Sequence, residues 1–539
     1  MKQNRKILNI IIRYLFILSC PFLTMLLSNR YKPKITFIGS ILSFIVAIII
    51  DRQFLRKVHF NLKKLIVSIF ISIYSLKYYL QYDNTSINYI NWLSGKYIHL
   101  YNKDFFYLIF LTISIISFSV LIYFIIDKII PSLMKFVKRL STIEKRYIII
   151  ISVIGLLISI VLPRVTTAFS IPYHKDELVI YDVIYTSDSG AITYEDSFFN
   201  VSYEQNDIRQ PLFGVLSLPI SIVGKILSEL LYMVPSNFQY AAAMTFLQFI
   251  LLAYTTILIA RMLKLKDKEK NYFYLLISCS FPYLVFSILL EQYVIALTYL
   301  ITACYIYYEG NMKVNYLYVG SVGTLITSGI ILPLISKARN IKEWVIDALN
   351  CFGIFTSMMI IGGQFPQVLL FKNNLFGLTS SFAKKLSFYE KFKQFSRFIR
   401  MQFIASDGFI TKVLSHPSYQ QTIAKNIDYI GISIVIIAIL GFIMNRKNKF
   451  AQFCLLWMLF SVILLLLFGW GTAENGLILY SLYFGFSYVS LVFLFIKSTI
   501  NNKILFKMII ITLCLIMIVF NINELINIFK FSIKFYRIK

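Results

Sequence analysis

The chain has 539 residues, of which 58% are hydrophobic and only 14% are charged, and its formal net charge is +28. Soluble domains carry about 25% charged residues, so this composition excludes an ordinary soluble protein and predicts an all-α polytopic membrane protein. The basic residues lie in short segments between apolar runs, which favours loops beside anionic membrane lipid and excludes nucleic acid as the main partner.

Apolar runs predict about 13–14 transmembrane helices, because about 20 such residues cross the hydrocarbon core of a bilayer. The first run follows MKQNRK and lacks a small-residue cleavage site, so we expect it to be retained as a helix. The predicted spans are 7–28, 35–50, 64–81, 105–127, 147–163, 239–261, 272–289, 292–308, 314–336, 343–362, 428–445, 451–469, 475–497 and 504–521.

Four basic segments set the predicted orientation. The positive-inside rule places them in the cytoplasm with the N-terminus, and it leaves the segment after Pro163 on the extracytoplasmic side. The abundance of Ile, Lys, Asn, Phe and Tyr is typical of bacteria with AT-rich genomes, so we expect a bacterial cytoplasmic (inner) membrane protein. The four segments are 51–64, 129–146, 261–270 and 445–449.

We divide the chain into four parts on this basis. Residues 1–146 hold the N-terminal transmembrane helices, and 147–362 form a core that includes a large extracytoplasmic loop at 164–238. A second extracytoplasmic loop occupies 363–427, and 428–539 hold the C-terminal transmembrane helices and a basic tail.

The first extracytoplasmic loop is acidic, unlike the rest of the chain. Carboxylates beside a bilayer are costly unless they serve a function, so we expect chemistry here; a solvated loop, or one that binds a structural cation, is the alternative. The six cysteines lie inside apolar runs and the four histidines are scattered, so neither predicts a metal site. The loop's acidic residues between positions 164 and 207 are Asp176, Glu177, Asp182, Asp188, Glu195, Asp196, Glu204 and Asp207.

Several of these residues stand in motifs that suit catalysis. Asp188 lies in the turn-prone TSDSG, Asp196 follows in YEDSFFN, and Asp207 and Arg209 precede a helix that Pro211 introduces. A loop carboxylate would act as a general base that takes a proton from an acceptor hydroxyl or amine. A nearby arginine would neutralise the phosphate that leaves.

Two apolar segments of the core do not fit a simple span. Residues 212–234 contain Pro219, Lys225 and Glu229, so we expect a helix that lies in the outer interface. Residues 314–336 contain TSG in their middle and are interpreted either as a pair of half-length helices or as one straight helix.

Further candidates lie outside the acidic loop. Glu291 stands alone between two apolar runs, which favours a side chain that lines a cavity or pairs with a cation. Trp470 in GWGTAENG is predicted to lie in a short outer turn. Residues 384–403 form a basic amphipathic pattern, so Arg397 or Arg400 would bind a phosphate, or the helix would rest on anionic lipid.

The motifs DIRQPLFGVLSLPISIVGKIL and GSVGTLITSGIILPLI resemble elements of the GT-C superfamily of integral membrane glycosyltransferases, which includes protein O-mannosyltransferases and lipid A aminoarabinose transferases. The resemblance covers approximately 147–362 and implies a GT-C-like helical bundle with juxtamembrane helices and catalytic acids in the first outer loop. Asp176 fits the usual distance of these acids from the first core helix, and Asp188 fits their character, so both stay open as the base.

The sequence therefore predicts an enzyme that moves a sugar from a polyprenyl-phosphate donor to an envelope glycan, lipid or protein on the extracytoplasmic face. Arg209 with Arg397 or Arg400 would hold the donor phosphate, and Glu291 would line the cavity. Asp196 and Asp207 would position the acceptor or a divalent cation, the one cofactor left open. The alternatives are a lipid-linked glycan flippase and an O-antigen-polymerase-like enzyme. A flippase needs charges within its spans, and their scarcity in this chain counts against that alternative.

Overall fold

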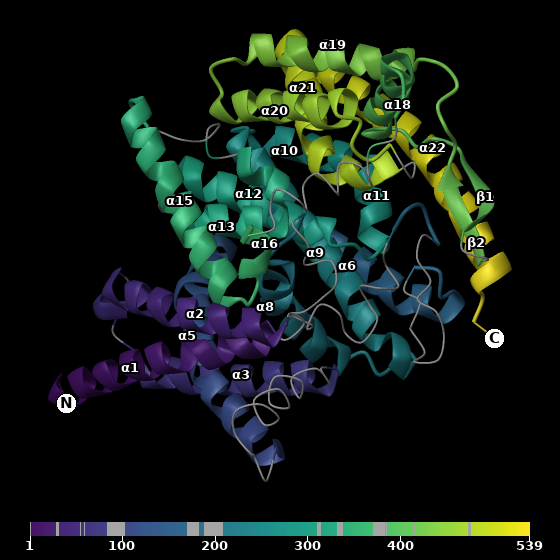
Figure 1. Cartoon of the computed structure of the whole chain (residues 1–539). Helices are drawn as coiled ribbons and strands as arrows, with labels where there is room; N and C mark the ends of the chain where they lie inside the picture. The colour runs from purple at the N-terminus through teal and green to yellow at the C-terminus, as the bar shows by residue number, and fades with distance from the viewer. Residues whose placement is uncertain are drawn as a thin grey trace.

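The computed structural model is almost entirely helical, with one two-stranded sheet, in the part of the chain that it describes (Figure 1). The prediction of an all-α polytopic membrane protein is confirmed. The described residues are 2–28, 32–53, 55–58, 60–82, 103–169, 183–187, 209–309, 314–330, 332, 338–369, 383, 385–413, 416–472 and 476–538.

Within these ranges, nine helices are long and apolar enough to cross a membrane. This number is below the predicted 13–14 because several apolar segments form shorter or bent helices. The candidate spans lie in α1 (Lys2–Leu27), α2 (Pro33–Gln53), α5 (Lys103–Lys138), α6 (Thr142–Val165), α9 (Gln239–Met262), α15 (Ile341–Ile361), α20 (Lys449–Ser461), α21 (Ser481–Thr499) and α22 (Lys503–Tyr536).

The shorter helices fall mostly in the core. Helices α10 (Asp267–Ser278) and α11 (Phe281–Ile288) meet at a bend of 67° and together would make a tenth span. The polar junction Cys279–Ser280 interrupts the apolar run there, so the predicted single span 272–289 is two pieces. The other shorter helices are α8 (Phe213–Ser228), α12 (Tyr293–Glu309), α13 (Val314–Thr324), α16 (Phe365–Leu369), α18 (Phe388–Met401) and α19 (Tyr429–Met444). Helix α3 (Leu62–Tyr82) has 21 residues but is not one of the candidate spans.

The N-terminal helices pack into a layer of their own at the end of the molecule opposite α19 (Figure 1). A small core that includes Phe16, Ala47 and Tyr123 joins α1, α2 and α5. The turn after α15 fastens this layer to the rest: Gly363 adopts φ +71°, and a Cβ there would lie 2.6 Å from the backbone of Leu27. Only glycine combines that conformation with so close an approach.

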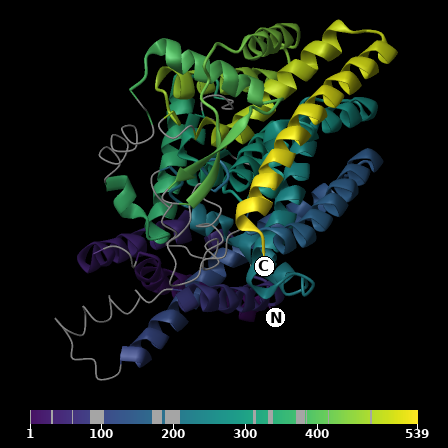
Figure 2. The same cartoon turned by 90° about the vertical axis from the view of Figure 1, so that its right-hand side faces the viewer.

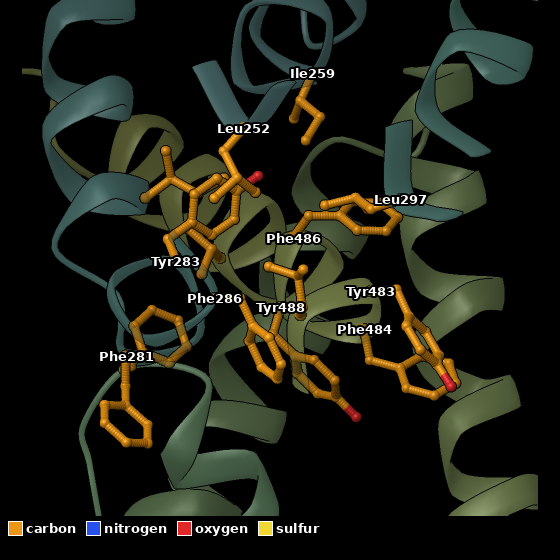
Figure 3. Packing of buried hydrophobic residues seen from close by; sticks show 14 of the residues in the cluster. Leu252, Ile259, Phe281, Tyr283, Phe286, Leu297, Tyr483, Phe484, Phe486 and Tyr488 are labelled. Carbon is orange, nitrogen blue, oxygen red and sulfur yellow. The ribbon is translucent and has the colours of Figure 1, made fainter. Parts of the chain in front are cut away.

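The main core surrounds α21. In the candidate span Leu477–Thr499, which contains this helix, 94% of the most apolar stretch is buried. In a bilayer, lipid tails are as apolar as side chains, so tight van der Waals packing holds helices together rather than removal from water. The aromatic rings of α21 supply that packing. Figure 3 shows side chains of α9, α11, α12 and α21 meeting in this core: Leu252, Ile259, Phe281, Tyr283, Phe286, Leu297, Tyr483, Phe484, Phe486 and Tyr488.

Three of the four basic segments meet at one end of the helices. Glu144, buried at the start of α6, accepts hydrogen bonds from Arg261 at 2.6 Å and from Lys270 at 3.1 Å. Asn448, in the turn between α19 and α20, donates to the carbonyl of Leu263 at 3.4 Å. The segments 129–146, 261–270 and 445–449 are therefore neighbours, as a common membrane face requires.

Helix α22 runs along one side of the molecule beside a β-hairpin (Figure 2). Strands β1 (Gly408–Val413) and β2 (His416–Gln421) are antiparallel, with Phe409 opposite Gln420. The sequence analysis missed this hairpin. It also ended the last span at residue 521 and assigned a basic tail beyond it, whereas the helix continues to Tyr536.

Candidate functional site

Four of the predicted site residues lie outside the part of the chain that the structure describes. They are Asp176, Asp188, Asp196 and Asp207. Their predicted roles as base and as acceptor-positioning groups therefore stay predictions. The remaining four, Arg209, Glu291, Arg397 and Arg400, lie in two separate polar regions.

The first region begins where two chain segments cross. The backbone N–H of Leu212 donates to the carbonyl of Gly323 at 2.9 Å, and the N–H of Ile326 donates to the carbonyl of Arg209 at 2.8 Å. A Cβ at Gly323 would lie 2.6 Å from a methyl group of Leu216, so the small residue permits the approach. We call residues 209–212 and 323–328 the crossing.

The crossing exists because the helix through residue 314 onward is broken. Helix α13 ends at Thr324 and a short 3-10 turn, η4 (Ile326–Ile330), follows. The hydroxyl of Tyr318 donates to the carbonyl of Gly329 at 2.9 Å. Residues eleven apart in a continuous helix are about 16 Å apart along its axis, so this bond requires the chain to turn back. Of the two interpretations of 314–336, the single straight helix is wrong; the second helix of the predicted pair falls partly outside the described residues and stays a prediction.

Helix α8 follows the first segment of the crossing. It begins at Phe213, and its N-cap position is Leu212. It packs between α9, α12 and α13: Gly224 lies against Met244, and the hydroxyl of Tyr299 donates to the carbonyl of Leu216 at 2.6 Å. The sequence placed this segment in the outer interface as a non-spanning helix. With 16 residues it is a shorter apolar helix rather than one of the nine candidate spans.

Glu291 lies between α11 and α12 and is 1% exposed. Gln248 of α9 fixes the backbone there: its amide nitrogen donates to the carbonyls of Phe286 and Leu289, both at 3.1 Å, and its oxygen accepts from the N–H of Glu291 at 3.2 Å. One buried glutamine thus satisfies three backbone groups that the break between the helices leaves without helical partners.

Arg209 and Glu291 belong to the same polar region. Both act electrostatically on the hydroxyl of Tyr293, and Arg209 acts on that of Tyr483 as well. Tyr480 packs against both tyrosine rings and accepts a hydrogen bond from the indole of Trp470 at 2.7 Å. We call the crossing together with Glu291, Tyr293, Trp470, Tyr480 and Tyr483 the junction site.

Some buried polar atoms of the crossing have no hydrogen-bond partner among the residues that the structure describes. They are Oε1 of Gln210, Oγ1 of Thr327 and Oγ of Ser328. Gln210 is 4% exposed and Ser328 is completely buried. In contrast, the hydroxyls of Ser321 and Thr324 in the adjoining helix bond to backbone carbonyls three or four residues earlier.

The second polar region joins a short piece of the acidic loop to the hairpin and α22. The backbone N–H of Tyr185 donates to the carbonyl of Tyr419 at 2.6 Å, and the N–H of Tyr419 donates to the carbonyl of Val183 at 2.9 Å. Their hydroxyls both donate to Oε1 of Glu524, at 3.4 Å and 2.9 Å. The amide of Gln420 donates to the carbonyl of Tyr185 at 2.6 Å. We call Tyr185, Tyr419, Gln420 and Glu524 the tyrosine–carboxylate cluster.

This cluster fixes residues 183–187 against the hairpin and α22. Burial raises the pKa of both the Tyr185 and the Tyr419 hydroxyl well above the usual value, and the neighbouring Glu524 raises it further, so both stay protonated donors. Tyr185 also adopts a left-handed backbone conformation, with φ +56°. That conformation costs a non-glycine residue about 1–2 kcal/mol, which the surrounding hydrogen bonds offset.

Arg397 and Arg400 lie near this second region. Both guanidinium NH₂ groups of Arg397 donate to Thr422, each at 2.7 Å. Burial lowers the pKa of Arg397, and the positive charge of Arg400 adds to this effect. Arg400 forms an ion pair with Asp428 at 3.0 Å. Both arginines therefore stabilise the described part of the segment 363–427, and their predicted part in binding a phosphate stays a prediction.

Sequence reasoning missed the tyrosine–carboxylate cluster entirely. Glu524 gave one signal, because a lone carboxylate within an apolar helix is costly unless it has partners. Nothing in the sequence indicates that Tyr185 and Tyr419, which are 234 positions apart, are those partners. The same holds for Gln248, whose three backbone contacts come from the bend after α11.

Comparisons with family models, with curated proteins and with solved structures found no match to this chain. The chemistry of the two polar regions is therefore the basis for assigning a function.

Proposed function

We propose that this membrane protein is a glycosyltransferase that transfers a sugar from a polyprenyl-phosphate donor to an envelope acceptor. The observation that carries the proposal is the junction site: Arg209 in the crossing and the buried carboxylate of Glu291 both lie near Tyr293, where helix α13 and the α11–α12 pair are interrupted. Arg209 also ends the acidic loop in the sequence, so a cation and the predicted catalytic acids belong to neighbouring segments. Buried charges at interrupted membrane helices usually serve a substrate.

The step that such a site would perform is a direct displacement. The acceptor oxygen forms a bond to the anomeric carbon while the bond from that carbon to the lipid phosphate breaks. The phosphate leaves with the electron pair, and a carboxylate takes the acceptor's proton. Arg209 would stabilise the charge that develops on the phosphate. Asp188 or Asp176 is the proposed base, and Glu291 is proposed to line the donor pocket and orient Arg209.

The proposed orientation follows from the basic end of the helices. If segments 129–146, 261–270 and 445–449 face the cytoplasm, the C-terminal end of α6 and the tyrosine–carboxylate cluster lie on the extracytoplasmic side. Polyprenyl-phosphate sugars would be used on that side of a bacterial cytoplasmic membrane. A membrane-impermeant thiol reagent would test this on single cysteines at Lys266 and Glu229, in a background without the native cysteines; only the second should react in intact cells.

A transfer assay with purified protein and labelled polyprenyl-phosphate sugars tests the activity itself. We expect Arg209→Gln to lower the transfer rate about 100-fold or more, the usual effect of losing a charged donor that faces the transition state. Glu291→Gln should lower it too, whereas Glu229→Gln, on a more exposed carboxylate at the end of α8, should not. Absence of transfer by the wild-type protein with every donor tested would overturn the proposal. Product length separates a single transfer from polymerisation.

A flippase for lipid-linked glycans is the second candidate, because transporters also place binding sites at discontinuous helices. The interrupted helix α13–η4 and the bent pair α10–α11 are of that kind. Movement of a lipid-linked glycan across proteoliposomes without sugar transfer would favour it. Retention of that movement in Arg209→Gln would count against a role of the junction site in either activity.

A further inference from the structure

We propose that the crossing is a binding subsite for the hydroxyl groups of a sugar, which deepens the proposed function and depends on it. The subsite consists of Gln210, Thr327 and Ser328, next to Arg209. The observation behind it is that buried polar atoms of these side chains lack a partner within the described part of the chain.

Buried polar atoms without partners are unusual, because each one loses its bonds to water and gains none in return. The crossing holds three, one in residues 209–212 and two in residues 323–328, whereas the hydroxyls of Ser321 and Thr324 bond to carbonyls of their own helix α13. Poor local geometry therefore does not explain them. A ligand that bonds to these atoms does.

The chemistry of the three atoms selects the ligand. The amide oxygen of Gln210 is an acceptor only, whereas the hydroxyls of Thr327 and Ser328 both donate and accept. A sugar hydroxyl complements all three, since it also donates and accepts. A phosphate offers acceptors only and so cannot serve Gln210; an apolar polyprenyl chain offers neither kind of group. Arg209, in the same segment, provides the cation for the donor's phosphate.

Stability gives the first test, because an atom kept for a ligand contributes nothing to the empty protein. Ser328→Ala and Gln210→Leu should leave the thermal unfolding midpoint unchanged or raise it. The matched control is Ser321→Ala, which removes a hydroxyl that is bonded and should lower the midpoint slightly. A lower midpoint for Ser328→Ala than for Ser321→Ala would show a structural role, for example through a bound water, and would overturn the proposal.

Binding gives the second test. The probes are polyprenyl-phosphate mannose and polyprenyl-phosphate glucose, with the same polyprenyl phosphate without sugar as the control ligand. We expect Ser328→Ala and Gln210→Leu each to weaken binding of at least one sugar-bearing probe about tenfold, which corresponds to ~1.4 kcal/mol for one lost hydrogen bond. Binding of the sugarless lipid should not change, and Ser321→Ala should bind all three lipids like the wild type.

The outcomes separate this subsite from the proposed function. If the wild-type protein transfers sugar and both variants bind every probe normally, the subsite is wrong and the function stands. If both variants lose the sugarless lipid equally, the crossing does not recognise the sugar. If the wild-type protein neither binds nor transfers the sugar-bearing lipids, the function and the subsite fail together.

Discussion

The crossing and the tyrosine–carboxylate cluster are both buried and polar, and both join chain segments that are far apart in the sequence, but they differ in how their polar atoms are satisfied. In the cluster, Glu524 accepts hydrogen bonds from two tyrosine hydroxyls, and the amide of Gln420 donates to the carbonyl of Tyr185. In the crossing, Gln210 and Ser328 keep atoms without partners. A satisfied network stabilises the fold, whereas an unsatisfied one costs stability and indicates binding.

The largest expected effect comes from breaking the satisfied region. Glu524→Leu removes the acceptor of two buried tyrosine hydroxyls, so we expect a loss of about 3–5 kcal/mol in the free energy of unfolding. Glu524→Gln, which keeps a carbonyl acceptor, should lose clearly less. The measurement is unfolding in detergent micelles followed by tryptophan fluorescence. Equal stability of Glu524→Leu and the wild type would show that the cluster does not hold the loop.

The second comparison concerns the geometry of the crossing. Gly323→Ala places a methyl group 2.6 Å from the side chain of Leu216 and 3.0 Å from that of Leu212. We expect about 1–3 kcal/mol of destabilisation from this overpacking, with loss of any sugar transfer. The matched control is Gly353→Ala on α15, where no atom lies within 4 Å of the new methyl group. That variant should be as stable as the wild type or slightly more stable.

A third prediction applies the same substitution to both regions. Gln420→Leu leaves the carbonyl of Tyr185 without its donor, so we expect a loss of about 1–2 kcal/mol. Gln210→Leu removes an oxygen that has no partner and should cost nothing. The measurement is the thermal unfolding midpoint of each variant relative to that of the wild type. Equal losses would remove the distinction between the two regions.

The last prediction concerns pH. The pKa of the Tyr185 and Tyr419 hydroxyls is higher in the folded than in the unfolded protein, so the folded state retains protons that the unfolded state releases above about pH 10. Their contribution is therefore complete below pH 10 and declines as the pH rises further. Each hydroxyl lowers the free energy of unfolding by at most about 1.4 kcal/mol for each pH unit above 10. A Tyr185→Phe, Tyr419→Phe double variant should show a shallower loss of stability between pH 10 and 11, and an unchanged slope would contradict the assignment.

Much of the helical framework could be predicted from apolar runs, because about 20 apolar residues suffice for a span. The breaks within these helices were harder to predict. The TSG motif left the helix from residue 314 open between broken and straight, and the hydrogen bond from Tyr318 to Gly329 resolved it. The hairpin at 408–421 gave no clear alternation of polar and apolar residues. Glu291 was singled out for its isolation among apolar residues; the structure shows that it is 1% exposed between α11 and α12, and its predicted role in lining a cavity stays a prediction.

The sequence by itself determined the membrane class, the approximate positions of the spans and the presence of charges where membranes usually exclude them, because these follow from local composition. The tertiary structure decided which distant residues become partners. Arg209 meets the break after α13, and Glu524 meets two tyrosines, only because helices from different parts of the chain pack side by side. Whether a buried polar atom is satisfied depends on such neighbours, and that property distinguishes the two regions.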